Sequence, residues 1–236
     1  MLAALILGAS PALATTPAPI GLFTSLPILW PEEQDVASVL ATQGKPHWAA
    51  NVLTERGPVL ALDRLASTDP SLARIRLLVM AQPRPLAPAE SVALDRWLRK
   101  GGRLLLFADP LHTGESRFAF GDKRRPQDIA MLAPLLAHWG LTLDFAADQP
   151  PGERQAQVLA VPLPVPLPVN MPGVLVAARG RGKCRPDDAG LSALCRIGKG
   201  RAIIIADAAV FDHSDGESAA QMAALRALLA HLAAMR

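Results

Sequence analysis

Short apolar runs alternate with amphipathic stretches along this chain. Three runs have the length of a strand and are almost continuously apolar: 20–24, 75–81 and 103–108. The stretch between the last two predicts a helix, because Leu94, Trp97 and Leu98 share one face and Gly101 follows a basic last turn. Strand, helix and strand make a βαβ unit. Strands that are apolar on both faces indicate a parallel sheet covered on both sides.

The same reasoning extends to weaker segments. Shorter strands are predicted at 59–62, 141–143, 174–178 and 202–206. Helices are predicted at 32–40, 126–139 and 218–236. Pro134 lies inside the second helix and predicts a kink there. The pattern favours one α/β domain over residues 15–236, with an irregular Pro-rich and basic insertion at about 146–200.

Four alternating prolines stand out within that insertion, at positions 162, 164, 166 and 168. Proline has no N–H to donate to a neighbouring strand, so this segment cannot be a central strand. We expect it at a sheet edge or as an extended connection.

The first 14 residues predict a signal peptide. Residues 2–8 are apolar or small, and Ala12-Leu13-Ala14 follows, which is the small-x-small pattern of a cleavage site. The basic residue that normally precedes such a core is absent, and a buried first strand is the alternative interpretation. With cleavage, the mature chain begins near Thr15 and is expected in the periplasm, either free or associated with the membrane.

Composition excludes several classes of protein. Of the 236 residues, 50% are hydrophobic and 19% are charged, with a formal net charge of +3, so the chain is not intrinsically disordered. No apolar run approaches the ~20 residues of a membrane-spanning helix, so a polytopic membrane protein is excluded and no stable transmembrane anchor is expected in the mature chain.

Charge is unevenly distributed. The segment 179–201 contains seven Lys or Arg against Asp187 and Asp188, a net charge of +5. Such a segment can bind an anionic lipid, a phosphate group or nucleic acid, or it can be a solvated hairpin. Aromatic residues are absent from it, which argues against nucleic acid as a partner because bases stack on rings.

Cys184 and Cys195 are the two cysteines of the chain and flank a turn-rich segment. In an oxidising periplasm they are expected to form a disulfide. Two independent buried thiols are the alternative. A zinc site is not expected, because no histidine lies nearby.

Polar residues follow two strands that end alike, Phe107-Ala108-Asp109 and Ile205-Ala206-Asp207. Ligands of open α/β sheets bind beyond the carboxyl ends of the strands. The candidate ligand-binding residues are therefore Asp109, His112, Asp207, Asp212 and His213. A catalytic or metal role is a second possibility. A third is purely local: Asp109 precedes Pro110 as a turn start, and residues 214–217 read as a capping box for the last helix.

Motifs of several enzyme classes are missing from the sequence. It contains no G-x-S-x-G, no G-x-G-x-x-G and no Walker A segment. We accordingly assign no catalytic residue, no metal ligand and no cofactor.

Two segments resemble a known family. The run 77–109 (LLVMAQPRPLAPAESVALDRWLRKGGRLLLFAD) and the run 195–211 (CRIGKGRAIIIADAAVF) are similar to the GldG-like domain of uncharacterised ABC-type transport system accessory proteins. The resemblance implies a three-layer sandwich with a mostly parallel, flavodoxin-like sheet, as in the class I glutamine amidotransferase superfamily. In this branch the catalytic Cys–His–Glu triad is generally lost. The C-terminal transmembrane helix common in the family has no counterpart here.

The resemblance also implies a function. We expect a non-catalytic extracytoplasmic accessory or binding domain, whose partner is an ABC-transporter permease or another envelope protein. The first alternative is a hydrolase or metal-dependent enzyme that uses Asp109, His112, Asp207 and His213. The second is a structural interaction module unrelated to transport.

Overall fold

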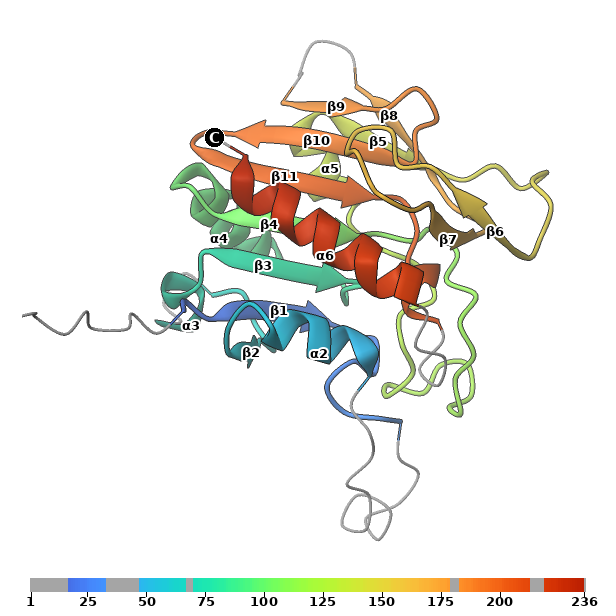
Figure 1. Ribbon diagram of the computed structural model, residues 1–236, viewed down its shortest axis with the longest axis horizontal. Coiled ribbons are helices and arrows are strands. Elements are labelled where there is room, and N and C mark those ends of the chain that lie inside the picture. Colours follow the sequence, from blue (N-terminus) through green and yellow to red (C-terminus); the bar gives the residue numbers. More distant parts are fainter. Residues whose placement is uncertain (1–16, 33–46, 67–69, 179–182, 213–218, 236) are drawn as a thin grey trace, which may run out of the picture.

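A seven-stranded sheet forms the centre of the computed structural model, which describes residues 17–32, 47–66, 70–178, 183–212 and 219–235 (Figure 1). In spatial order its strands are β2 (Val59–Ala61), β1 (Ile20–Thr24), β3 (Leu77–Ala81), β4 (Arg103–Phe107), β11 (Gly200–Ile205), β10 (Ser192–Ile197) and β9 (Cys184–Pro186). The first five run parallel. Their order, 2-1-3-4-5 along the chain, is that of the flavodoxin-like folds, and the predicted α/β class is confirmed.

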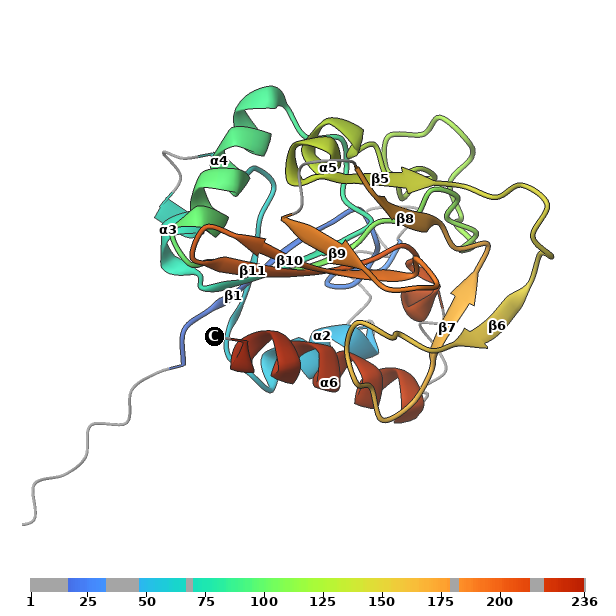
Figure 2. The ribbon, with the colours of Figure 1, turned by 90° about the horizontal axis from the view of Figure 1, so that it is seen from above.

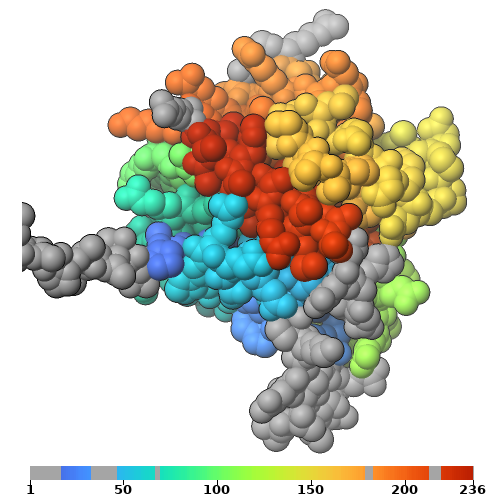
Figure 3. Space-filling view, in the orientation of Figure 1, coloured from blue at the N-terminus to red at the C-terminus, as the bar shows by residue number. Residues whose placement is uncertain are grey.

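Helices cover both faces of this sheet, giving three layers (Figure 2). The helices α2 (Trp48–Thr54) and α6 (Ala219–Ala234) pack on one face. Figure 3 shows these two helices side by side. The other face is covered by α3 (Pro70–Arg74), α4 (Pro88–Arg99) and α5 (Ala133–Trp139). In β4, Leu105 and Phe107 face α6, whereas Leu104 and Leu106 face α4, which explains why the strand reads as a continuous apolar run.

The βαβ unit of β3, α4 and β4 matches its prediction closely. Pro88 occupies the first turn of α4, where its missing N–H costs nothing. Glu90 accepts hydrogen bonds from the backbone N–H groups of Ala87 and Leu65, at 2.9 and 3.1 Å. Gly101, with φ of 115°, ends the helix in a conformation that other residues rarely adopt.

The predicted helix 126–139 is wrong in its first half. The helix α5 begins at Ala133, and Pro134 lies in its first turn, so no kink arises. Residues 111–132 form a loop tied to the carboxyl end of β4. Within it, the His112 N–H donates to the Asp128 carbonyl at 2.8 Å. Backbone hydrogen bonds of this kind use groups that a helix over 126–132 would need, so no helix forms there despite the apolar spacing.

The segment 146–200 is more regular than its sequence indicates. The strands β6 (Glu153–Ala156) and β7 (Leu167–Asn170) form one antiparallel pair, and β5 (Leu141–Asp144) and β8 (Val174–Ala177) form another. Pro168 lies in β7, whose partner is β6 alone, as expected for an edge position. The strands β10 and β11 make a hairpin whose turn includes Gly198, at φ of 59°.

The two cysteines form the expected disulfide. Cys184 and Cys195 are opposite each other in β9 and β10, and both are buried. The last helix is also confirmed as a packed one, with Leu225, Leu229 and Leu232 buried against the sheet.

Several predictions fall on other parts of the chain. The signal peptide, nearly all of the helix 32–40, the capping box 214–217 and His213 lie outside the described residues. Within the described ranges, none of the helices is both long enough and apolar enough to cross a bilayer.

Candidate functional site

The carboxyl ends of β1, β3, β4 and β11 meet along one edge of the sheet, which we call the carboxyl edge. In the sheet, β2 lies on one side of β1, and β3 with the strands that follow it lies on the other side. The strand order therefore reverses between β1 and β3, which is the topological switch point. This is the place where open α/β sheets bind ligands. Both strand-end aspartates and the loop 111–132 lie along this edge.

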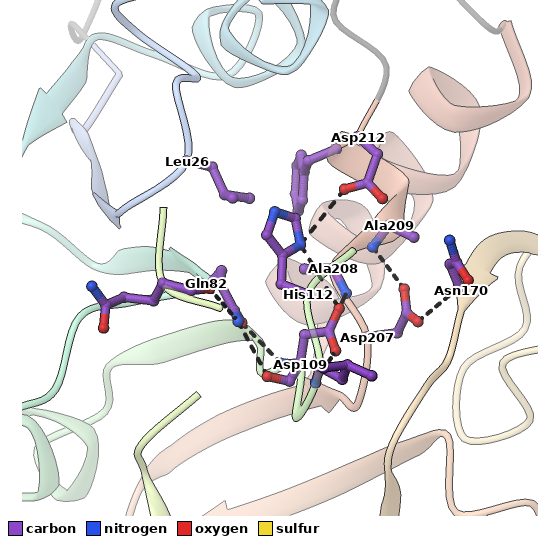
Figure 4. Close-up of polar contacts among 12 residues, drawn as sticks. Leu26, Gln82, Asp109, His112, Asn170, Asp207, Ala208, Ala209 and Asp212 are labelled. Atoms are coloured by element: carbon purple, nitrogen blue, oxygen red, sulfur yellow. Dashed lines mark hydrogen bonds and ion pairs between the residues drawn. The ribbon is translucent and has the colours of Figure 1, made fainter. Parts of the chain in front are cut away.

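Asp109 follows β4 and is fully buried, with 0% exposure. Its Oδ1 accepts a hydrogen bond from the Leu111 N–H at 2.8 Å. Its Oδ2 accepts one from the Ala208 N–H at 3.2 Å (Figure 4). The first bond closes a local Asx turn, and the second ties the end of β4 to the end of β11.

Asp207 follows β11 and repeats this arrangement. It is 2% exposed, and its Oδ1 accepts from the Ala209 N–H at 2.7 Å. Its Oδ2 accepts from the Asn170 N–H at 3.0 Å, which ties β7 to the sheet (Figure 4). Both aspartates thus have the turn role that their sequence allows, extended by a long-range tether.

His112 and Asp212 complete the cluster. The Nδ1 of His112 lies 3.6 Å from Asp212 Oδ1 and 3.9 Å from Asp109 Oδ2, and the His112 side chain is 6% exposed. This Nδ1 has no hydrogen-bond partner among the described residues. Gly114 allows the approach, since a Cβ there would come within 2.7 Å of the imidazole and 2.8 Å of Asp212 Oδ1. Four of the five candidate residues are thereby gathered.

Burial shifts the pKa values of this cluster. It raises the pKa of Asp109 to about 7, against the two backbone hydrogen bonds. It raises the pKa of Asp207 to about 8, and the negative charge of Asp109 adds to the effect. Burial lowers the pKa of His112 to about 4. Groups that titrate near neutrality can exchange protons with a substrate, which is the chemistry that this arrangement makes available. The described residues include no group of three or more His, Cys, Asp or Glu able to hold a metal ion.

Gln82 is a site residue that the sequence reading missed. It follows β3 at the switch point, is fully buried and has φ of 42°. Its Nε2 donates to the carbonyls of Asp109 and Gln127, at 3.1 and 2.9 Å, and its Oε1 accepts from the Asp109 N–H at 2.9 Å. A left-handed backbone at a non-glycine residue is costly and persists only where its surroundings impose it. The available signal is a polar residue between a buried strand and Pro83.

Ser25, just beyond β1, completes the closure of this edge. Its hydroxyl donates to the Gln82 carbonyl at 2.5 Å and accepts from the Gln127 N–H at 2.9 Å. The loop 111–132 is therefore fastened across the ends of β1 and β3. The side chains of Ser25 and Gln82 at the switch point bond to backbone groups of neighbouring segments.

A cavity of about 440 Å³ lies between α4 and α5. Its lining is mostly apolar and includes Leu86, Val92, Met131 and Leu135. None of the candidate residues lines this cavity.

The fold is similar to that of several solved structures. An exo-β-1,4-mannosidase from Opitutaceae bacterium strain TAV5 matches with a TM-score of 0.53 and 14% identity, over 92% of this chain and 36% of the mannosidase. A ThuA-like protein from Bacteroides uniformis matches with a TM-score of 0.52 and 13% identity, over 95% of each chain. The mmIFT52 N-terminal domain matches with a TM-score of 0.52 and 17% identity, over 80% of this chain and 90% of that domain.

These likenesses concern the fold alone. The chain spans about a third of the mannosidase, so the activity of that enzyme does not transfer. The ThuA-like neighbour is consistent with the α/β fold expected from the sequence. No protein with a curated function matches the sequence.

The family comparison concerns the best-predicted part of the chain. Residues 57–147, which include the βαβ unit, match the family model described as "ABC-type uncharacterized transport system". The resemblance seen in the sequence is confirmed over this segment, which is less than half of the chain and includes the run 77–109.

Proposed function

We propose that this chain is a non-catalytic, extracytoplasmic accessory domain that binds a permease or another envelope protein of an ABC-type transport system. The family match over residues 57–147 supports the link to transport. One observation supports the non-catalytic role. In both strand-end aspartates, each carboxylate oxygen accepts a hydrogen bond from a backbone N–H.

A catalytic carboxylate has to reach a substrate atom together with other groups that converge on it. Asp109 and Asp207 are 0% and 2% exposed, and Gln82 packs against the Asp109 backbone. A substrate would have to displace hydrogen bonds that join separate strands. This geometry favours a supporting role for both aspartates.

The disulfide supports the extracytoplasmic location. Disulfides persist in oxidising compartments and are rare in a reducing cytoplasm. The Cys184–Cys195 bond lies inside the sheet, and the expected signal peptide at 1–14 is consistent with the same compartment.

Location can be tested on the whole chain in its native cell. We expect a C-terminally tagged chain to be digested by protease added to intact spheroplasts, and its thiols to resist alkylation until a reductant is added. A cytoplasmic enzyme in the same cells serves as the control for leakage. Protection of the chain until the cells are lysed would contradict the proposed location.

Partnership needs a separate experiment. The tagged chain is crosslinked in intact cells and purified from membranes, and the crosslinked proteins are identified by mass spectrometry. We expect the permease or ATPase subunit of an ABC transporter, and an unrelated exported protein with the same tag should not recover it. Efficient crosslinking without any transporter subunit would contradict the accessory role.

A second candidate function, an acid–base hydrolase, rests on His112. Its Nδ1 lies between Asp212 and Asp109 at 3.6 and 3.9 Å, as a general base oriented by carboxylates would. The variants His112→Gln and Asp212→Asn distinguish the two functions. The accessory role predicts that both keep transport-dependent growth. Loss of growth with an unchanged free energy of unfolding would favour the enzyme.

A further inference from the structure

Three arginines lie side by side at the edge of the sheet where the parallel strands begin and the antiparallel strand β10 ends. Arg103 in β4 is in register with Arg201 in β11, which is in register with Arg196 in β10. Register partners on neighbouring strands project from the same face of a sheet. Leu105 and Ile203, two residues further along their strands, pack with α6, so this row lies on the α6 face.

The row concentrates positive charge. Partial burial lowers the pKa of the Arg201 guanidinium, and the neighbouring charges of Arg196 and Arg103 lower it further. Arg103 donates hydrogen bonds to the carbonyls of Leu232 and Met235, so it also closes the C-terminal end of α6. Like charges directly opposite each other destabilise a sheet, so the row is not explained by strand pairing alone.

Further cations extend the row along the same edge. Arg76 precedes β3, Lys100 follows α4, and Lys199 lies in the turn between β10 and β11. All three are exposed, and none forms an ion pair within the described ranges. We call the full set the basic edge: Arg76, Lys100, Arg103, Arg196, Lys199 and Arg201.

Two other arginines of this region are not counted, because carboxylates neutralise them. Arg99 pairs with Asp95 at 2.6 Å, and Arg226 pairs with Glu55 at 2.5 Å.

The carboxyl edge carries charges of both signs. Asp63 follows β2 and Asp187 lies between β9 and β10 on this side. Asp109 and Asp207 add little negative charge near neutral pH, because burial raises their pKa values to about 7 and 8. The loop 111–132 adds exposed cations. The six residues of the basic edge, in contrast, are all cations, and a molecule with cations concentrated at one edge orients itself in the field of a charged surface.

Both ends of the described chain lie at the basic edge. Pro17 is three residues before β1, and Met235 directly follows α6, where Arg103 holds it. In Figure 1 the strand arrows of β1, β3, β4 and β11 point to the right, and the start of β1 and the end of α6 lie at the left. The first and last described residues therefore lie beside the basic edge.

We propose that the basic edge docks the domain on the anionic phospholipid surface of a membrane, with the carboxyl edge pointing away from it. The six cations come from three strands and three connecting segments, so they form a broad front rather than a pocket. Neighbouring strands are about 4.8 Å apart, so β3 to β10 span roughly 15 Å, comparable to a few lipid headgroups. Juxtamembrane basic residues attract anionic lipids in this way.

The inference goes beyond the proposed function and can fail independently of it, because no transporter is needed for the test. The complete purified chain is sedimented with vesicles of phosphatidylcholine containing about 30% phosphatidylglycerol, and with pure phosphatidylcholine vesicles. We expect binding to the anionic vesicles at low salt, and its loss at about 0.5 M NaCl, where the Debye length is only a few ångströms.

The decisive variant is the triple change Arg76→Glu, Lys100→Glu and Lys199→Glu. These side chains are exposed, so the variant should fold like the parent protein. Each basic residue near an anionic surface strengthens binding about fivefold, so we expect binding to weaken by a factor of about a hundred or more.

A matched control carries the same change of charge at the other edge. Arg64→Glu, Arg117→Glu and Lys123→Glu also reverse three exposed cations. The control should bind anionic vesicles within about twofold of the parent protein, since charges beyond a Debye length are screened. Circular dichroism confirms that both variants are folded.

Three outcomes would overturn the proposal. The first is no binding to anionic vesicles at low salt. The second is an equal loss in both triple variants, which would assign the effect to net charge alone. The third is binding of a poly-glutamate peptide without binding of vesicles, which would assign the basic edge to an acidic protein partner.

Discussion

The two edges of the main sheet are formed by the same strands but differ in the burial and bonding of their polar side chains. At the carboxyl edge, Gln82, Asp109 and Asp207 are buried and bonded to backbone groups of neighbouring strands. At the basic edge, Arg76 and Lys199 are exposed and form no ion pair with described residues. Open α/β sheets normally bind ligands at the carboxyl edge, but in this protein the polar side chains there hold neighbouring strands together.

This difference has an energetic consequence. A buried polar group that loses its partner costs about 1–3 kcal/mol, because neither water nor protein replaces the bond. An exposed charge contributes little to stability, because solvent screens it. Substitutions at the carboxyl edge should therefore lower the free energy of unfolding, and substitutions at the basic edge should alter binding at nearly constant stability.

The largest effect is expected for Gln82→Leu. The change removes three hydrogen bonds and leaves the buried Asp109 N–H without a partner, while the Asp109 carbonyl keeps only the Ala130 N–H as a donor. We expect the free energy of unfolding in urea to fall by about 3–4 kcal/mol. Gln155→Leu is the matched control, since Gln155 is exposed in β6, and it should change stability by less than about 0.5 kcal/mol. A loss below about 1 kcal/mol in Gln82→Leu would show that the carboxyl edge is held by other contacts.

Removal of the disulfide tests whether the strands near the basic edge are stabilised to a similar degree as the carboxyl edge. The disulfide joins β9 to β10, which carries Arg196, across a sequence separation of 11. Loop-closure entropy for so short a loop gives about 3 kcal/mol. We expect dithiothreitol to lower the urea midpoint of the parent protein accordingly. The double variant Cys184→Ala and Cys195→Ala should have the lower midpoint already and should not respond to the reductant.

The most predictable parts of the fold are those where all local signals agree. For β3, α4 and β4, apolar strands, Pro88 at the helix start and Gly101 at its end point to one structure. The convergence of Asp109 and Asp207 was also predictable, because parallel strands end at a common edge.

The failures share a physical cause, which is dependence on partners far away in sequence. Gln82 acquires its role from Asp109 and Gln127, which are 27 and 45 residues away. The apolar spacing of 126–139 fits a helix, but bonds from the loop to the sheet end prevail before Ala133. Short polar strands such as β9 depend on their neighbours for pairing and have little apolar pattern of their own.

A smaller effect is expected from pH, and it concerns the carboxyl edge alone. A carboxyl group whose pKa is raised in the folded state binds its proton more tightly there than in the unfolded chain, where aspartate titrates near 3.9. The stability contributed by these two protonated carboxyl groups is therefore fully present below about pH 4. It is lost as the pH rises through about 7 and 8, the pKa values of Asp109 and Asp207. His112, with its lowered pKa, acts in the opposite direction, but only below about pH 6.5.

Between pH 6.5 and 8 the two aspartates therefore act without opposition from the histidine. We expect the free energy of unfolding to fall by about 2 kcal/mol over this interval. Asp207→Asn removes the group with the higher pKa and should reduce the slope by more than half. A stability that stays constant from pH 6.5 to 8 would mean that both aspartates are ionised in the folded protein, held so by their backbone hydrogen bonds.

The smallest effect, and the most selective for the basic edge, is expected for Arg196→Gln. Arg196 lies opposite Arg201, and like charges in register cost about 0.2–1 kcal/mol. Removing one should raise the free energy of unfolding by about 0.5 kcal/mol at low salt and leave it unchanged at about 0.5 M NaCl, where screening has already removed the repulsion. Arg185→Gln is the matched control, because Arg185 is opposite the uncharged Leu194 and should respond at neither salt concentration. If Arg196→Gln instead destabilises the protein at both salt concentrations, the arginines stabilise the sheet through their aliphatic stems. The row would then be a packing element like the carboxyl edge, and the contrast between the two edges would fail.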